Sequence, residues 1–149
     1  MSFNRQISRR LHEDHEATLA LWNRFEQAAG ARDWPAEEDL VRHCASALAG
    51  EIAQHFEFEE TELFPRLIEA GEGDIAELLA EEHVAIRAAA HAFAAAFEKQ
   101  DWQQLRLAGL ELCERLGAHV QKEEMSLLPA VEDVLDDETD ARLALAYAG

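Results

Sequence analysis

The feature that most constrains this sequence is a motif that occurs twice. Residues 55–65 read HFEFEETELFP, and residues 119–129 read HVQKEEMSLLP. Each copy contains a His followed four residues later by a Glu, His55 with Glu59 and His119 with Glu123. On an α-helix, residues four apart lie on one face about one turn apart. Each copy therefore predicts a helix that presents an imidazole and a carboxylate together.

Apolar residues around each motif predict that this face is buried. They precede and follow the His-x-x-x-Glu pair at steps of three or four, as Ile52 and Leu63 do in the first copy and Leu116 and Leu127 in the second. Such spacing marks the stripe that a packed helix turns toward the core. A single polar residue on that stripe is commonly a hydrogen-bonded core residue, but the duplicated pairs predict a shared ligand set.

Two more His residues extend the repeat. His15 and His83 lie on the apolar faces of helices predicted at about 7–29 and 74–99. The offset between these two His is 68 residues, whereas that between the two His-x-x-x-Glu copies is 64. The second predicted helix thus has about one extra turn ahead of its His, which keeps the apolar stripe nearly in phase.

These helices predict an all-α fold. Ala, Leu and Glu dominate a sequence that is 48% hydrophobic, with seven Gly and three Pro. Pro65 is expected to kink or end the second helix, and Gly71 lies in a predicted turn. We predict one domain over residues 1–149: an antiparallel up-down four-helix bundle built from two helix-pair repeats at roughly 7–130, and a short C-terminal helical tail at 131–149.

Charge and composition narrow the partners. With 31 Asp and Glu against 13 Lys and Arg, the net charge is −18, and no basic stretch is present to neutralise phosphates, so we expect no nucleic-acid partner. No apolar run approaches the roughly 20 residues of a membrane span. We expect a cytoplasmic protein, a monomer or a weak homo-oligomer. Cys44 and Cys113 lack the spacing of a disulfide framework or a zinc knuckle.

The predicted ligand set holds four imidazoles and two carboxylates. This is more than one tetrahedral zinc needs, and it suits two transition ions, each with two His and both bridged by the carboxylates. Ferritin-like diiron bundles use Glu-x-x-His instead, and no Glu stands three residues before any His here, so the spacing excludes that family. The predicted metal ligands are His15, His55, Glu59, His83, His119 and Glu123.

The remaining His residues are not predicted to bind metal. His43 and His91 do not share the apolar stripe at the depth of the ligand set. His12 lies one helical turn before His15 and could support the site or relay protons.

The order of the predicted ligands resembles the hemerythrin-like HHE cation-binding domain family. That family places a His on the first helix, His-x-x-x-Glu on the second, a His on the third and His-x-x-x-Glu on the fourth. The resemblance spans roughly residues 10–130 and includes the sequence EETELFP at 59–65. It implies two iron ions with an oxo or hydroxo bridge, one bound by His15 and His55 and the other by His83 and His119, with Glu59 and Glu123 bridging. Zinc or manganese could substitute.

The sequence departs from the oxygen-carrying hemerythrins on the third helix. Those proteins have a His-x-x-x-His there, whereas Arg87 stands four residues after His83. His91 is eight residues on, roughly 12 Å along the helix and too far to substitute. One iron would keep an additional open position, which weakens the case for reversible oxygen carriage and strengthens that for reaction with oxygen, nitric oxide or peroxide.

We predict a diiron protein that binds or senses oxygen, nitric oxide or peroxide, rather than a dedicated enzyme. A cytoplasmic iron-handling or storage module is the second hypothesis, and a diiron oxidase or peroxidase is the third.

Glu60 and Glu124 raise the question of which carboxylate binds. Five residues rotate a side chain by about 140° from the His, against about 40° for four, so Glu60 and Glu124 would need a π-bulge to reach the same ion. We therefore expect Glu59 and Glu123 to be the ligands.

Overall fold

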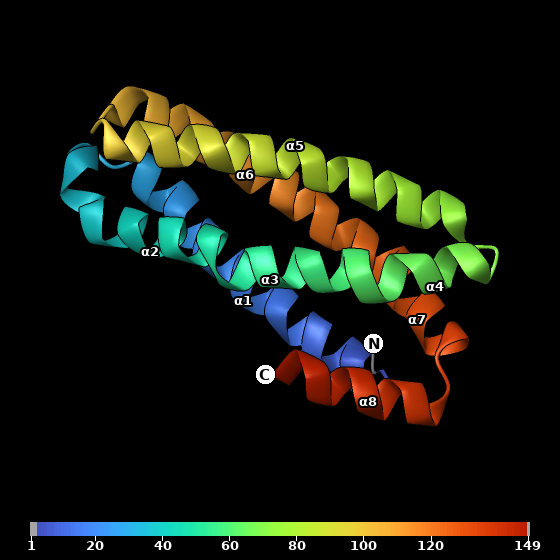
Figure 1. The fold of residues 1–149 in the computed structure, drawn as a ribbon. Helices are drawn as coiled ribbons and strands as arrows, with labels where there is room; N and C mark the ends of the chain where they lie inside the picture. The colour runs from blue at the N-terminus through green and yellow to red at the C-terminus, as the bar shows by residue number, and fades with distance from the viewer. Residues whose placement is uncertain (1–2, 149) are drawn as a thin grey trace.

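In the computed structural model of the chain, residues 3–148 are described, and they form helices joined by short turns (Figure 1). No strand occurs among these residues, so the prediction of an all-α fold is confirmed. The elements are α1 (Gln6–Ala29), the 3-10 turn η1 (Trp34–Glu37), α2 (Glu38–Ala49), α3 (Glu51–Phe58), the π-helical turn η2 (Glu59–Leu63), α4 (Phe64–Glu69), α5 (Gly73–Glu98), α6 (Trp102–Lys122), the π-helical turn η3 (Glu123–Leu127), α7 (Leu128–Val134) and α8 (Asp137–Ala148).

Two of the predicted helices are assembled from shorter pieces. The predicted second helix consists of α2, α3, η2 and α4, with Gly50 as the only residue between α2 and α3. The fourth consists of α6, η3 and α7 without interruption. The predicted first and third helices correspond to α1 and α5, each starting within one residue of its expected position. The helical periodicity of the sequence is therefore reproduced along the whole bundle.

The long helices pack side by side as a bundle (Figure 1). Helix α6 contacts both α1 and α5, and α5 also packs on α2 and α4. Helix α8 lies beside the beginning of α1 (Figure 1).

The core is divided into two apolar clusters along the bundle axis. One cluster includes the buried aromatic residues Trp22, Phe25 and Phe93. The other includes Leu11 and Leu63. On each long segment the predicted ligands stand between residues of the two clusters, for example His15 between Leu11 and Trp22. Apolar packing at both ends thus fixes a polar layer in the middle.

The tail predicted for the C-terminus is docked on the bundle. The backbone N–H groups of Gln6 and Ile7 donate to the Asp140 carboxylate, both at 2.9 Å. The Glu132 carboxylate accepts hydrogen bonds from the backbone N–H groups of Asn4 and Arg5, at 2.6 and 2.8 Å. The N-cap residue of α1 is Arg5, whose side chain makes no capping hydrogen bond, so acids from α7 and α8 satisfy the free N–H groups at this helix end.

Close packing in the aromatic cluster depends on a glycine in α6. A Cβ added at Gly109 would lie 2.0 Å from the Phe25 ring, which is fully buried and packs against Trp22, Trp34 and Phe93 at ring-centroid distances of 5.3 to 5.6 Å. The neighbouring rings oppose a movement of the Phe25 ring away from such a Cβ. Gly117 on the same helix has no atom within 4 Å of such a Cβ.

We therefore predict opposite effects for two Gly to Ala changes in α6. Gly109→Ala should lower the free energy of unfolding by about 1–3 kcal/mol through overpacking. Gly117→Ala should raise it by up to about 1 kcal/mol, because Ala favours the helix. Urea denaturation of both variants measures these changes, and equal effects would show that the Phe25 ring does not pack against Gly109.

Candidate metal centre

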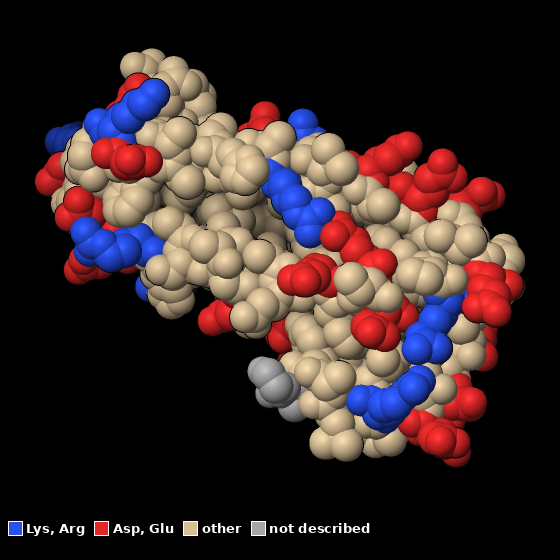
Figure 2. Space-filling model, in the orientation of Figure 1, with Lys and Arg blue, Asp and Glu red and all other residues tan. Residues whose placement is uncertain are grey.

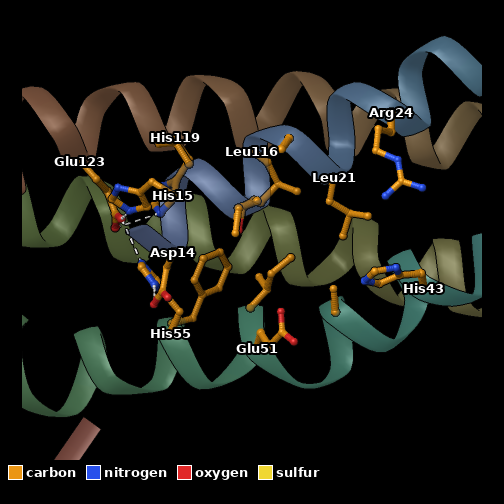
Figure 3. Close-up of a pocket in the computed structure, with 17 residues that line it drawn as sticks. Asp14, His15, Leu21, Arg24, His43, Glu51, His55, Leu116, His119 and Glu123 are labelled. Atoms are coloured by element: carbon orange, nitrogen blue, oxygen red, sulfur yellow. Dashed lines mark hydrogen bonds and ion pairs between the residues drawn. The ribbon is translucent and has the colours of Figure 1, made fainter. Parts of the chain in front are cut away.

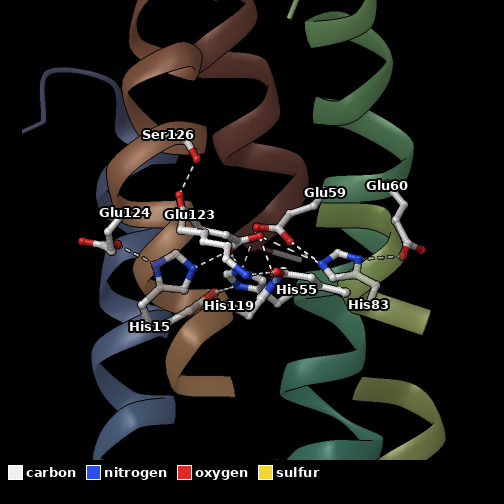
Figure 4. A network of polar contacts seen from close by, with 12 residues as sticks. His15, His55, Glu59, Glu60, His83, His119, Glu123, Glu124 and Ser126 are labelled. Carbon is white, nitrogen blue, oxygen red and sulfur yellow. Dashed lines mark hydrogen bonds and ion pairs between the residues drawn. The ribbon is translucent and has the colours of Figure 1, made fainter. Parts of the chain in front are cut away.

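The polar layer of the bundle brings all six predicted ligands together. They form two overlapping groups, and in each group the ligand atoms of four residues lie within 4.8 Å of one another. Every member is buried. One group contains His15 and His55, the other contains His83 and His119, and both contain Glu59 and Glu123. These six residues are called the ligand cluster below (Figure 4).

Glu59 lies between the two His pairs. Its Oε2 is 3.0 Å from Nε2 of His55, and its Oε1 is 3.1 Å from Nε2 of His83. Each oxygen of this carboxylate thus faces a different pair.

Glu123, the first residue of η3, faces the two His pairs in the same way. Its Oε1 is 2.6 Å from Nε2 of His15, and its Oε2 is 3.1 Å from Nε2 of His119. Two carboxylates that each offer one oxygen to either His pair have the geometry of bridging ligands.

Several atoms of the ligand cluster have no hydrogen-bonding partner among the described residues. They are both carboxylate oxygens of Glu59, one of Glu123, and Nε2 of His83 and of His119. These nitrogen and oxygen atoms lie close to one another. They face a common centre rather than one another, so the contacts between them do not have the geometry of hydrogen bonds. Buried ionised carboxylates in this situation are costly, and a cation at the centre satisfies them. Imidazole nitrogen and carboxylate oxygen together suit iron, zinc or manganese. The cluster can hold a metal ion.

A second carboxylate lies behind each of the four imidazoles. Every Nδ1, the nitrogen that faces away from the cluster, is 2.6 to 3.1 Å from an acid on a neighbouring helix. An ionised carboxylate only accepts hydrogen bonds, so Nδ1 carries the proton and Nε2 is directed into the cluster. We call these acids the outer acids; the pairs are Asp14 with His55, Glu60 with His83, Glu82 with His119, and Glu124 with His15.

The outer acids follow the internal repeat, although the sequence analysis did not identify them. Asp14 and Glu82 directly precede the lone His of each repeat, and each bonds to the second His of its own repeat. Glu60 and Glu124 directly follow the Glu of each cluster motif, and each bonds to the lone His of the other repeat. The signal was present as an acid beside each ligand, but the partner lies on another helix.

The π-helical turns explain the positions of the paired glutamates. η2 begins at Glu59 and η3 at Glu123, and each closes with a hydrogen bond to that residue's carbonyl from an N–H five residues on. A proline, Pro65 or Pro129, stands two residues after the end of each π-helical turn. The helix continues beyond this proline in both cases. Because the wider turn moves the upstream carbonyl away from the proline ring, neither proline ends its helix. The π-bulges occur, yet Glu59 and Glu123 still face the cluster.

Comparison with protein families agrees with this arrangement. Residues 74–144 match the model of the hemerythrin HHE cation binding domain. Over these residues the chain is similar to that domain. The resemblance seen in the order of the ligands is thereby confirmed. No curated protein and no solved structure shows significant similarity to the chain.

The family match covers one half of the bundle. It includes His83, His119 and Glu123, whereas the corresponding His15, His55 and Glu59 precede the matched segment. The structure places both sets in one cluster, so the first half supplies a counterpart that the family match does not reach.

None of the helices formed by residues 3–148 combines the length and apolar character needed to cross a membrane.

Each outer acid also contacts a residue that is not in the ligand cluster. Arg87 donates to both oxygens of Glu60, at 2.6 and 2.9 Å. An oxygen-carrying hemerythrin would be expected to have a His at this position, and here its place is taken by an ion pair that holds the acid behind His83. His12 lies 2.6 Å from Glu124, in agreement with its predicted supporting position. The other two contacts are Lys122 with Glu82 and Tyr147 with Asp14.

The other His residues lie outside the cluster. His91 is exposed on α5, and His43 lines the outer part of a cavity. This cavity has a volume of about 370 Å³ and extends from His15, His55 and His119 between α1, α3 and α6 (Figure 3). Leu21, Ile52 and Leu116 form part of its apolar wall. It provides a route from the surface to one side of the ligand cluster.

The buried imidazoles and carboxylates perturb one another's pKa values. Burial lowers the pKa of His119, but the close approach and charge of the Glu123 carboxylate outweigh burial and raise it to about 9. The pKa values of His15 and His55 are also raised, since nearby carboxylates again outweigh burial. Burial raises the pKa of Glu123, but the close approach of His119 and the hydrogen bonds from His15 and His55 hold it well below its usual range. Without metal, the charged imidazolium groups of His15, His55 and His119 therefore stabilise the Glu123 carboxylate.

We predict that protein stripped of metal by a chelator loses stability as pH rises from about 6.5 to 9. A His with a raised pKa stabilises the fold fully below its unfolded value of about 6.5, and this contribution disappears as pH rises through the folded value, which is about 9 for His119. The free energy of unfolding should fall by on the order of 2 kcal/mol over this range, measured by urea denaturation.

Metal should reverse this trend, because metal binding requires unprotonated His. The stability difference between metal-loaded and stripped protein should be largest at alkaline pH and narrow toward acid. His91→Gln, at an exposed position, is a control that should leave both pH profiles unchanged. Stripped protein that is more stable at pH 9 than at pH 6.5 would contradict the raised His pKa values.

Neighbouring glutamates provide a second test of the site. Glu123→Ala should abolish binding of metal, because Glu123 faces both His pairs. Glu124→Ala removes only the acid behind His15, so metal should be retained with affinity reduced about 10- to 100-fold. Metal content and competitive chelator titration measure both effects. Equal losses in the two variants would show that the distinction between cluster and outer acid is wrong.

Proposed function

We propose that this protein binds or senses oxygen, nitric oxide or peroxide at a non-haem diiron centre. The observation that carries the proposal is the sharing of both carboxylates by the two His pairs, because one oxygen of each faces either pair. In this assignment His15 and His55 hold one iron, His83 and His119 hold the other, and Glu59 and Glu123 bridge them. Zinc or manganese would be accepted as substitutes.

The donor count supports an open centre. Two nitrogens and two bridging oxygens leave each ion below the coordination number that iron commonly reaches, so a small exogenous ligand or an oxo or hydroxo bridge has room to bind. When bound, iron supplies this ligand binding and its redox chemistry. The cavity of about 370 Å³ gives a small molecule access to the side of His15 and His55.

The protein's own residues fix the ligands and exclude bulk water. The outer acids hold the four imidazoles with Nε2 directed inward. The Phe56 ring is stacked on His83, with centroids 3.8 Å apart and an angle of 7° between the planes, and it also contacts the His119 ring edge-on. Such support keeps the first coordination sphere in place before metal arrives.

A fold and domain assignment accompanies this function. We infer an antiparallel up-down four-helix bundle of two helix-pair repeats, because short turns connect consecutive long segments and neighbouring segments contact one another. We also infer one hemerythrin-like domain, in which α8 forms the tail. A monomer or weak homo-oligomer in the cytoplasm remains our expectation.

Two alternatives have some support from the structure. The surface in Figure 2 carries many Asp and Glu and only scattered Lys and Arg, and the net charge of −18 would concentrate cations near an iron-handling module. The cavity is larger than a diatomic ligand requires, which favours a diiron oxidase or peroxidase. Ready loss of iron to chelators would favour the first alternative, and turnover with peroxide or nitric oxide the second.

We predict that protein expressed with ample iron contains two iron atoms per chain. Its near-ultraviolet and visible absorption should change on exposure to oxygen, nitric oxide or peroxide. Elemental analysis and anaerobic titration followed by absorption spectroscopy measure these properties.

Variants of the cluster provide the comparison. His119→Ala should lose at least half of the iron, whereas the exposed His91→Ala should keep all of it. One iron per chain, or zinc alone despite ample iron, would contradict a diiron centre. An absorption spectrum that no ligand changes would contradict sensing or binding at the centre.

A further inference from the structure

Near the end of α8, Tyr147 contacts the candidate metal centre. Its hydroxyl donates a hydrogen bond to Oδ2 of Asp14. The same Asp14 oxygen lies 3.1 Å from Nδ1 of His55, and the hydroxyl itself is 3.4 Å from that nitrogen. Tyr147, Asp14 and His55 thus form a chain of contacts that runs from α8 through α1 to α3.

The Tyr147 ring is held in place by apolar and cationic contacts. It packs against Phe58 with ring centroids 4.6 Å apart, and the guanidinium group of Arg10 lies 5.5 Å from the ring centre. Helix α8 itself is fixed by the buried Leu143 and by Asp140 at the start of α1. The hydroxyl group is therefore presented to Asp14 by a docked helix.

Asp14 is the outer acid that most needs such support. Its side chain is 41% exposed, compared with 20 to 30% for Glu82, Glu124 and Glu60. Its distance to the imidazole, 3.1 Å, is also the longest of the four. A carboxylate this exposed can turn toward water and release the His behind which it lies, unless a second contact holds it.

We propose that Tyr147 is a positioning residue of the metal centre, which holds Asp14 and, through it, keeps Nε2 of His55 directed toward the ion bound with His15. This inference rests on the proposed function, since it assigns His55 as a metal ligand. It gives α8 a role in setting the metal affinity at one of the two positions. The corresponding outer acid of the other repeat, Glu82, is held by Lys122 instead.

The test is Tyr147→Phe, which removes the hydroxyl and keeps the ring that packs on Phe58. Zinc is the probe, because it is accepted by the same donors and is diamagnetic. Competitive chelator titration of the full chain should show two zinc ions, with one affinity lowered about 10-fold in the variant and the other unchanged. In the zinc-loaded variant, the ¹⁵N resonances of the His55 ring should shift more than those of His119.

Two further variants separate positioning from a structural effect. Leu145→Ala, at a residue of α8 that is 78% exposed, should change neither zinc affinity. In an Asp14→Ala background, Tyr147→Phe should cause no further loss, because the hydroxyl acts through the Asp14 side chain. An equal loss in both backgrounds would overturn the inference, as would unchanged affinities in the single variant.

The outcome for the unmodified chain keeps the two proposals distinct. If it does not bind two zinc ions, the assignment of the metal centre fails. If it binds two and Tyr147→Phe leaves both affinities and the His55 resonances unaltered, the centre stands and the role of Tyr147 is wrong. A lower affinity at both positions, with a matching loss of stability in metal-stripped protein, would also overturn the positioning role.

Discussion

The structure depends on the burial of two carboxylates in the middle of an apolar bundle. Glu59 and Glu123 are completely inaccessible to solvent, and such groups are costly in a protein interior unless charge and hydrogen bonds compensate. Four imidazoles surround them, four outer acids lie behind the imidazoles, and basic or hydroxyl groups hold those acids. Acidic groups thus alternate with basic or hydroxyl groups outward from the centre. Each layer provides hydrogen bonds or opposite charge to the layer inside it.

The sequence was sufficient for the parts of this arrangement that lie within one helix. The His-x-x-x-Glu spacing and the apolar stripe predicted that His55 and Glu59 share a buried face, and the structure brings them together with His15 and His83. The outer acids were not predicted, because their partners lie on other helices and an acid beside a His is common on exposed surfaces. The capping of α1 by Asp140 was missed for the same reason: it joins residues more than 130 positions apart.

The two repeats are similar at the centre and different around it. Glu60 and Glu82 are held by the basic residues Arg87 and Lys122, whereas Asp14 is held by a tyrosine from α8. The cavity also reaches the centre beside His15, His55 and His119, and its lining does not include His83. If two metal ions bind with the same donors, their positions would therefore differ in access from the cavity and in the groups that hold the outer acids. The two repeats would in this way provide two sites that are not equivalent.

The capping of α1 by the later helices affects how the protein is made. Asp140 and Glu132 satisfy the first N–H groups of α1, and the ribosome adds both after every residue of the ligand cluster. A nascent chain therefore carries all six ligands before its first helix has its caps. The hydrogen bonds that complete the start of α1 can therefore form only after α8 has left the ribosomal exit tunnel, later than every residue of the ligand cluster.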